Sequence, residues 1–167
     1  MKKILALTLA LAMLGTALTG CGSKDAATKI PAENIQQTAP VQQEQSQTEK
    51  ALALINTFAT GDTDIARSLL ADGYIQHNLA YGTGADAFIG SVEYLASADV
   101  KTTVENIRAF EDGDKVFLQT VYNFAGAGEQ VAFDIFRFDE NGKIAEHWDV
   151  METIADQSTW QNQNGKF

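Results

Sequence analysis

The amino-acid sequence predicts one α+β domain, with three helices followed by a curved antiparallel sheet. Apolar residues recur with the helical period of about 3.6 residues between positions 49 and 96. Between positions 101 and 154, β-branched and aromatic residues dominate, and they alternate in part with polar residues. Both prolines, Pro31 and Pro40, precede this region. Residues 49–154, a stretch of about 105 residues, contain no proline and have the size of one small domain.

The amino terminus has the pattern of a lipoprotein signal peptide. Lys2 and Lys3 precede an uncharged apolar run of about 14 residues, shorter than the roughly 20 that a membrane-spanning helix needs. The run ends in Leu18-Thr19-Gly20-Cys21, which resembles the bacterial lipobox and holds the only cysteine of the chain. We therefore expect cleavage before Cys21 and its acylation, which would anchor the protein on the extracytoplasmic side of the cell membrane. The alternative is an ordinary secreted protein with a chance cysteine at this position.

Composition divides the remaining chain into three parts. Residues 21–48 are rich in Gln, Ala and Thr without hydrophobic periodicity, which is typical of a flexible tether. Residues 49–154 form the predicted domain, and residues 155–167 form a polar tail with Trp160 as its one large apolar anchor.

The chain is acidic, which limits its partners. Loss of the signal peptide leaves ten basic residues (12 − 2) against 22 acidic ones. This balance argues against binding to nucleic acid, because phosphate contacts need clustered Lys and Arg. It argues equally against attraction to anionic lipid headgroups.

Three segments are predicted to be helical. Residues 49–60 end before Gly61, and Asp62 or Asp64 can cap a second, short helix. Residues 85–96 form the third helix. The apolar faces of the three helices are formed by Leu52, Ile55, Phe58 and Ala59; by Ile65, Leu69 and Leu70; and by Phe88, Val92 and Leu95.

The strands are predicted from β-prone runs bounded by turn residues. Residues 74–78 form a short extended piece before the third helix. The sheet follows, with strands at 101–110, 115–125, 130–138 and 143–154 and turns at Asp112-Gly113, Gly126-Ala127-Gly128 and Asn141-Gly142.

The last hairpin is the part of the sequence that suggests chemistry. If Asn141 and Gly142 are the two loop residues, paired positions sum to 283, and Asp134 lies directly opposite Asp149. Period-2 alternation adds Ala132, Phe136 and Phe138 to the face of Asp134, and Ala145, His147 and Met151 to the face of Asp149. Two carboxyl groups on such an apolar face should repel each other and lose hydration, which raises at least one pKa toward the range of a general acid or base.

The same alternation allows the opposite interpretation. Asp134 and Asp149 would then face solvent, with Val131, Phe133 and Ile135 in the core, and a three-residue loop with a bulge would shift the register by one. His147 and Trp148 each have an ordinary structural explanation, as a hydrogen-bonded sheet residue and as core packing. His77 can be structural as well.

These motifs resemble a known family. Tyr74-Ile75-Gln76-His77-Asn78, Phe136-Arg137-Phe138 and the run from Gly142 to Val150 (GKIAEHWDV) are similar to the SnoaL-like branch of the NTF2-like superfamily, over residues 49–154. The resemblance implies a cone-shaped α+β barrel with a deep apolar pocket. Polyketide cyclases of this branch perform an intramolecular aldol condensation with a pocket aspartate as acid/base and without a metal. That aspartate falls on Asp149. A pocket histidine of the cyclases falls on Asp134, which is a departure, and His77 belongs to a shared signature and is expected at the pocket.

The expected catalytic residues are Asp149, His77 and Asp134, with no metal and no cofactor. The residues expected to bind the ligand are Tyr74, Asn78, Tyr122, Phe136, His147, Trp148 and Met151.

Two hypotheses for function follow. In the first, Asp149 abstracts a proton beside a carbonyl of a small apolar compound, and His77 or a protonated Asp134 donates a hydrogen bond to the developing oxyanion. In the second, the pocket of the anchored protein binds an apolar ligand without chemistry. A metal site of His77, His147 and Asp149 is a weaker third hypothesis: His147 and Asp149 could reach one ion from the same strand face, but no HxH or HExxH spacing supports it. The family resemblance also suggests a homodimer formed through the outer face of the sheet.

Overall fold

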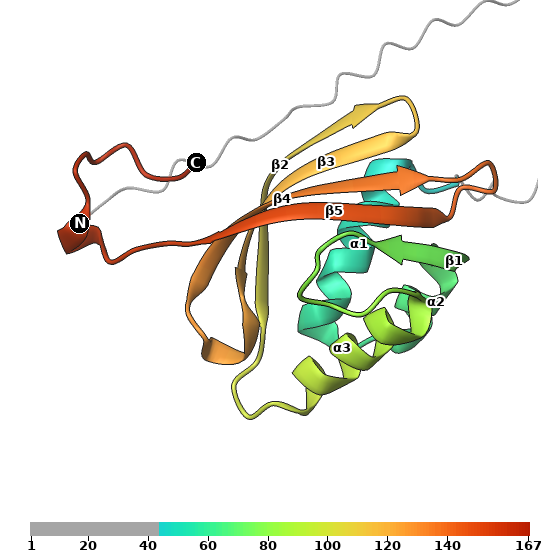
Figure 1. The fold of residues 1–167 in the computed structure, drawn as a ribbon, viewed down its shortest axis with the longest axis horizontal. Helices are drawn as coiled ribbons and strands as arrows, with labels where there is room; N and C mark the ends of the chain where they lie inside the picture. The colour runs from blue at the N-terminus through green and yellow to red at the C-terminus, as the bar shows by residue number, and fades with distance from the viewer. Residues whose placement is uncertain (1–43) are drawn as a thin grey trace, which may run out of the picture. The chain divides into compact units, whose positions relative to one another are not determined.

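The computed structural model describes residues 44–167, and these contain three helices and a five-stranded sheet (Figure 1). The helices are α1 (Gln47–Thr60), α2 (Thr63–Leu69) and α3 (Ala85–Ser97). The strands are β1 (Leu70–Gln76), β2 (Thr103–Asp112), β3 (Lys115–Asn123), β4 (Glu129–Phe138) and β5 (Ile144–Thr153), with short 3-10 turns at Phe124–Gly126 and Gln157–Thr159. The predicted α+β class is confirmed. The signal peptide, Cys21 and most of the predicted tether lie outside the described residues.

Local sequence signals explain the helix ends. Ser46 and Glu49 form a capping box at the start of α1: the Ser46 hydroxyl accepts from the Glu49 amide at 3.1 Å, and the Glu49 carboxylate accepts from the Ser46 amide at 2.8 Å. Gly61 ends α1 in a left-handed conformation with φ of 75°, which glycine adopts without a steric cost. Asp62 caps α2 by accepting from the Ile65 amide at 2.9 Å. No helix among the described residues combines the length and the apolar character needed to cross a membrane.

The sheet has the strand order β1-β5-β4-β3-β2 and wraps around the helices (Figure 1). The four strands from β2 to β5 form the predicted antiparallel meander. The expectation of a wholly antiparallel sheet is wrong, because β1 pairs with β5 in parallel. The chain reaches β5 only after α3 and the other three strands of the meander, so the sequence pattern of β1 carries no signal for the direction of its partner.

The register of the last hairpin is as predicted, although its turn is not. Asp134 pairs with Asp149, and paired positions sum to 283 from Gln130 to Arg137. At the turn, however, Phe138 pairs with Ile144, and the Asp139 amide donates to the Lys143 carbonyl at 2.8 Å. The longer loop shifts the register by one, and a bulge between the two pairings shifts it back.

Because of the bulge, one residue of β5 does not lie on the face that the sequence predicts. Ala145 was expected on the side of Asp149, but Ile144 is the residue that is fully buried there. The helix faces also need a correction, since α1 buries Ala51, Leu54 and Ile55, whereas Ile65 of α2 is exposed. The core therefore lies between the helices and the concave side of the sheet.

The convex side of the sheet is unusually apolar. Phe110, Phe117, Phe133 and Val150 are exposed there. Near them, the buried amide of Gln119 donates to the carbonyl of Lys166 at 3.0 Å, so the predicted polar tail returns to the sheet. A homodimer through this face stays a prediction.

Candidate active site

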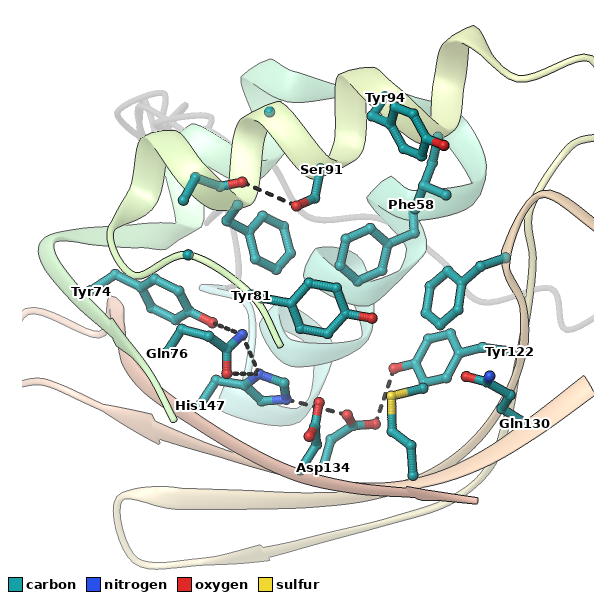
Figure 2. Close-up of a pocket in the computed structure, with 18 residues that line it drawn as sticks. Phe58, Tyr74, Gln76, Tyr81, Ser91, Tyr94, Tyr122, Gln130, Asp134 and His147 are labelled. Atoms are coloured by element: carbon teal, nitrogen blue, oxygen red, sulfur yellow. Dashed lines mark hydrogen bonds and ion pairs between the residues drawn. The ribbon is translucent and has the colours of Figure 1, made fainter. Parts of the chain in front are cut away.

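A cavity of about 500 Å³ lies between the helices and the concave side of the sheet (Figure 2). Its wall is largely aromatic, with side chains from α1, β1, α3 and β3 and from the connecting segments. These aromatic residues are Phe58, Tyr74, Tyr81, Phe88, Tyr94, Tyr122 and Phe124. No Lys or Arg between residues 44 and 167 lines the cavity, whereas Asp134, His147 and Asp149 all do. The cavity thus combines an apolar wall with a small polar cluster from β4 and β5.

Asp134 is a buried carboxylate whose two oxygens both have partners. Its exposed fraction is 3%. The Tyr122 hydroxyl donates to one oxygen at 3.0 Å, and the Nε2 atom of His147 lies 3.2 Å from the other. Burial, with Asp134 next, raises the pKa of Tyr122, so this phenol keeps its proton and remains a donor.

His147 is buried between β1 and β4. Its ring stacks on Phe136 with centroids 4.4 Å apart, and its Nδ1 atom lies 3.0 Å from Nε2 of Gln76. Phe136 therefore packs against the His147 ring. It does not line the cavity, contrary to its predicted role as a ligand-binding residue. Its position follows from the predicted alternation, which places it on the core side of β4.

Asp149 is half-buried and has a single partner among the described residues. The Asn78 amide donates to its Oδ1 atom at 2.6 Å. Burial is the main cause that raises the pKa of Asp149, opposed by His147 and Asn78 and assisted by Asp134. Its second oxygen accepts no hydrogen bond from the described residues and is available to a ligand.

The pKa of Asp149 predicts how stability depends on pH. Because the folded state holds this proton more tightly than the unfolded state, stability falls as pH rises from the unfolded value of about 3.9 through the raised folded value. At pH values above that window, the loss of stability caused by ionisation of Asp149 no longer changes with pH. Urea unfolding of the wild type and of Asp149→Asn, measured from pH 3.5 upward, should show the variant gaining stability relative to the wild type across the window. A stability difference between wild type and Asp149→Asn that does not change with pH would contradict the raised pKa of Asp149.

His77 and Trp148 lie on the other side of the sheet. Their rings stack with centroids 4.4 Å apart and an interplanar angle of 6°, and His77 Nε2 lies 3.0 Å from a carboxylate oxygen of Glu146. Glu146 also accepts from Arg137, and His77 and Arg137 together lower its pKa. Neither His77 nor Trp148 lines the cavity, so their predicted roles there are wrong. The physical reason is strand alternation, since Tyr74 and Gln76 of β1 point inward and the next residue points outward.

Sequence reasoning missed Gln76, which holds the polar cluster together. Its amide contacts Tyr74, His147 and the backbone of Asn78. The period-2 spacing of Tyr74, Gln76 and Asn78 is the sequence signal that places Gln76 on the same face as Tyr74. The motif Tyr74-x-x-His77-Asn78 does not include Gln76. Tyr81, on the loop after β1, also lines the cavity and had no sequence signal.

Asp134, His147 and Asp149 each offer a ligand atom, and these atoms lie within 4.8 Å of one another. A cation bound there would have to replace the hydrogen bond between His147 and Asp134. His77 cannot join such a set, because it lies on the opposite side of the sheet. The metal site suggested by the sequence therefore does not form with its original ligands.

Comparison with known proteins gives the fold and a family. A sequence profile of the SnoaL-like domain matches residues 51–147, which is more than half of the chain. No curated protein matches the chain.

Several solved structures share the fold. An NTF2-like protein of unknown function from Cytophaga hutchinsonii is 16% identical, covers 66% of this chain and 94% of its own, and has a TM-score of 0.57. An LEH-like epoxide hydrolase from M. tuberculosis is 17% identical, with coverages of 64% and 82% and a TM-score of 0.56. A candidate polyketide cyclase from Bacillus cereus is 16% identical, with coverages of 64% and 74% and a TM-score of 0.55. The predicted NTF2-like fold is confirmed.

Proposed function

The chain belongs to the SnoaL-like domain family of the NTF2-like superfamily, and on this premise we propose that it catalyses proton transfer on a small apolar carbonyl compound. The observation that carries the proposal is Asp149, a half-buried carboxyl group with a raised pKa and a free oxygen at an aromatic cavity. Such a group is suited to general acid–base chemistry. The fold also serves enzymes that act on small organic molecules, as the epoxide hydrolase and the candidate cyclase illustrate.

The amide of Asn78 determines which oxygen of Asp149 does the chemistry. Its Oδ1 atom accepts from the Ala80 amide at 2.9 Å, so its Nδ2 atom is the one that donates to Asp149 Oδ1. Asp149 Oδ1 is therefore occupied as an acceptor. The proton is taken up and returned at Oδ2.

The reaction needs no additional reagent. Asp149 Oδ2 takes a proton from the carbon next to the carbonyl, the C–H electrons form a C=C bond, and the carbonyl π electrons move to oxygen. In an aldol-type reaction, the enolate carbon then forms a bond to a second carbonyl carbon of the same substrate. The proton passes from Asp149 to the new alkoxide, which restores the carboxylate.

Asp134 and His147 influence Asp149 electrostatically. Asp134 accepts from Tyr122, lies within hydrogen-bond distance of His147 Nε2, and contributes to the raised pKa of Asp149. Because both oxygens of Asp134 already have hydrogen-bond partners, we do not propose it as the donor to the oxyanion. His77 is excluded from that role by its position on the convex side of the sheet.

Binding of an apolar ligand without chemistry is the second candidate function. Seven Phe and Tyr residues line the cavity, and an extracytoplasmic anchor suits a protein that captures ligands. The two functions differ in one measurable property, because only the enzyme exchanges protons with what it binds.

A test uses 2-acetylnaphthalene, an uncharged aromatic methyl ketone, in D₂O. The proposed enzyme should accelerate incorporation of deuterium at the methyl group, followed by NMR, above the rate in buffer alone. Binding without acceleration would support the second function and reject the first. Absence of both would reject an apolar carbonyl compound as the ligand.

Membrane attachment through Cys21 is part of the proposal. In a bacterium that processes lipoproteins, the full chain should partition into the detergent phase of Triton X-114, and Cys21→Ser should move it to the aqueous phase, because no thioether to diacylglycerol can form. Ser23→Ala, outside the lipobox, should partition like the wild type. A Cys21→Ser variant that remains in the detergent phase would contradict the anchor.

A further inference from the structure

We propose that Tyr74 is the catalytic hydrogen-bond donor to the substrate's carbonyl oxygen. This inference deepens the proton-transfer function proposed above and rests on it. It comes from the directions of the hydrogen bonds around Gln76, which can be assigned one after another starting from a backbone amide (Figure 2).

The first step fixes the orientation of the Gln76 side chain. The backbone N–H of Asn78 points at the Oε1 atom of Gln76 at 2.9 Å. A peptide N–H is only a donor, so the atom it meets is the amide oxygen. The Nε2 atom of Gln76 therefore lies on the other side, with two hydrogens to donate.

The second step follows these two hydrogens. Nε2 of Gln76 lies 3.3 Å from the Tyr74 hydroxyl and 3.0 Å from Nδ1 of His147. In the tautomer with a hydrogen on Nε2, His147 donates to Asp134, and its Nδ1 atom accepts from Gln76 Nε2. In a form with a hydrogen on Nδ1, His147 can instead donate to Gln76 Oε1 at 3.1 Å. In both states Gln76 Nε2 remains the donor to Tyr74.

The third step concerns the hydrogen of Tyr74. Its oxygen accepts from Gln76, and no residue between 44 and 167 accepts the hydroxyl hydrogen. Tyr122 differs, because its hydrogen is already donated to Asp134. Tyr74 is 2% exposed and lines the cavity, so its hydrogen can reach only a cavity ligand. Burial, with Asp149 and Asp134 next, raises the pKa of Tyr74, and the phenol therefore stays protonated.

The resulting site has two complementary ends. Tyr74 offers a hydrogen to the oxygen on which negative charge develops, and Asp149 Oδ2 accepts the proton from the adjacent carbon. Both side chains line the same cavity, and Asp149 is, after burial, the next cause of the raised pKa of Tyr74. A neutral donor that is already positioned in the folded protein stabilises an enolate without prior rearrangement. The substrate class is thus an uncharged ketone or aldehyde with an acidic α-hydrogen.

The test uses 2-acetylnaphthalene labelled with ¹³C at the carbonyl, bound to the purified domain and observed by infrared spectroscopy. A donated hydrogen bond lowers the carbonyl stretching frequency. Tyr74→Phe should return the band toward its frequency in an apolar solvent and weaken binding by about 2- to 12-fold, the ratio that corresponds to one net hydrogen bond. Tyr122→Phe is the matched control and should leave the band where the wild type has it, because its hydrogen is directed at Asp134.

The outcomes separate this inference from the proposed function. A band that Tyr74→Phe does not move, or one that moves in Tyr81→Phe instead, overturns the role of Tyr74 while leaving proton transfer by Asp149 intact. If the band moves in Tyr74→Phe but the wild type exchanges no α-hydrogens, the hydrogen bond stands and the proposed reaction fails. A ketone that does not bind the wild type at all overturns both.

Discussion

Replacing Asp149 with asparagine is expected to lower the protein-catalysed rate of α-deuterium exchange by 100-fold or more. A positioned general base contributes about 10²- to 10⁴-fold to a rate, and an amide cannot take up the α-proton. The fold should survive, because the amide oxygen can still accept from Asn78 and the cost of a desolvated carboxylate is removed. The measurement is the NMR exchange assay with 2-acetylnaphthalene, with folding checked by circular dichroism.

The matched control is Asp99→Asn, which makes the same chemical change at an exposed position outside the cavity. It should exchange at the wild-type rate. A rate for Asp149→Asn within a few-fold of the wild type would remove Asp149 from the mechanism and leave binding as the function.

Replacing Phe136 with alanine is expected to cost about 3–5 kcal/mol of unfolding free energy. Phe136 is 1% exposed and is among the largest fully buried side chains of the described residues. Its removal leaves a void beneath the His147 ring, with which it now stacks at 4.4 Å. Because small domains have only about 5–15 kcal/mol of stability, urea unfolding should show a large decrease in the midpoint.

Phe133→Ala provides the comparison, because Phe133 lies on the same strand three positions earlier and is 56% exposed on the convex side. Its loss should cost less than about 1 kcal/mol at the same protein concentration. Equal losses for the two variants, or a larger one for Phe133, would mean that the assignment of the two faces of β4 is reversed.

The register between β4 and β5 was predictable from the sequence for a partly fortuitous reason. Asp134 and Asp149 were placed opposite each other by assuming a two-residue loop, and the pairing is correct. The loop is longer, and the bulge near Ile144 compensates for it. Bulges depend on backbone packing that a hydrophobic pattern does not record, so the register could be predicted but the turn and the position of Ala145 could not.

The strand that positions the polar cluster was the least predictable part. Nothing in residues 70–76 signals that β1 pairs in parallel with β5, and this pairing brings Gln76 beside His147. Strand alternation alone would have separated His77 from Tyr74 and Gln76. The family resemblance suggested the opposite, because a shared sequence motif does not record which side of a strand each of its members occupies.

The central claim is that Asp149 is a carboxyl group whose acidity is weakened by an apolar interior. NMR titration of the domain labelled with ¹³C at aspartate carboxyl groups, with Asp149→Asn used to assign the resonance, measures its pKa directly. We predict a midpoint above the ordinary aspartate value of about 3.9. A midpoint at or below that value would show that burial does not outweigh the opposing effects of His147 and Asn78, and it would contradict the proposed site.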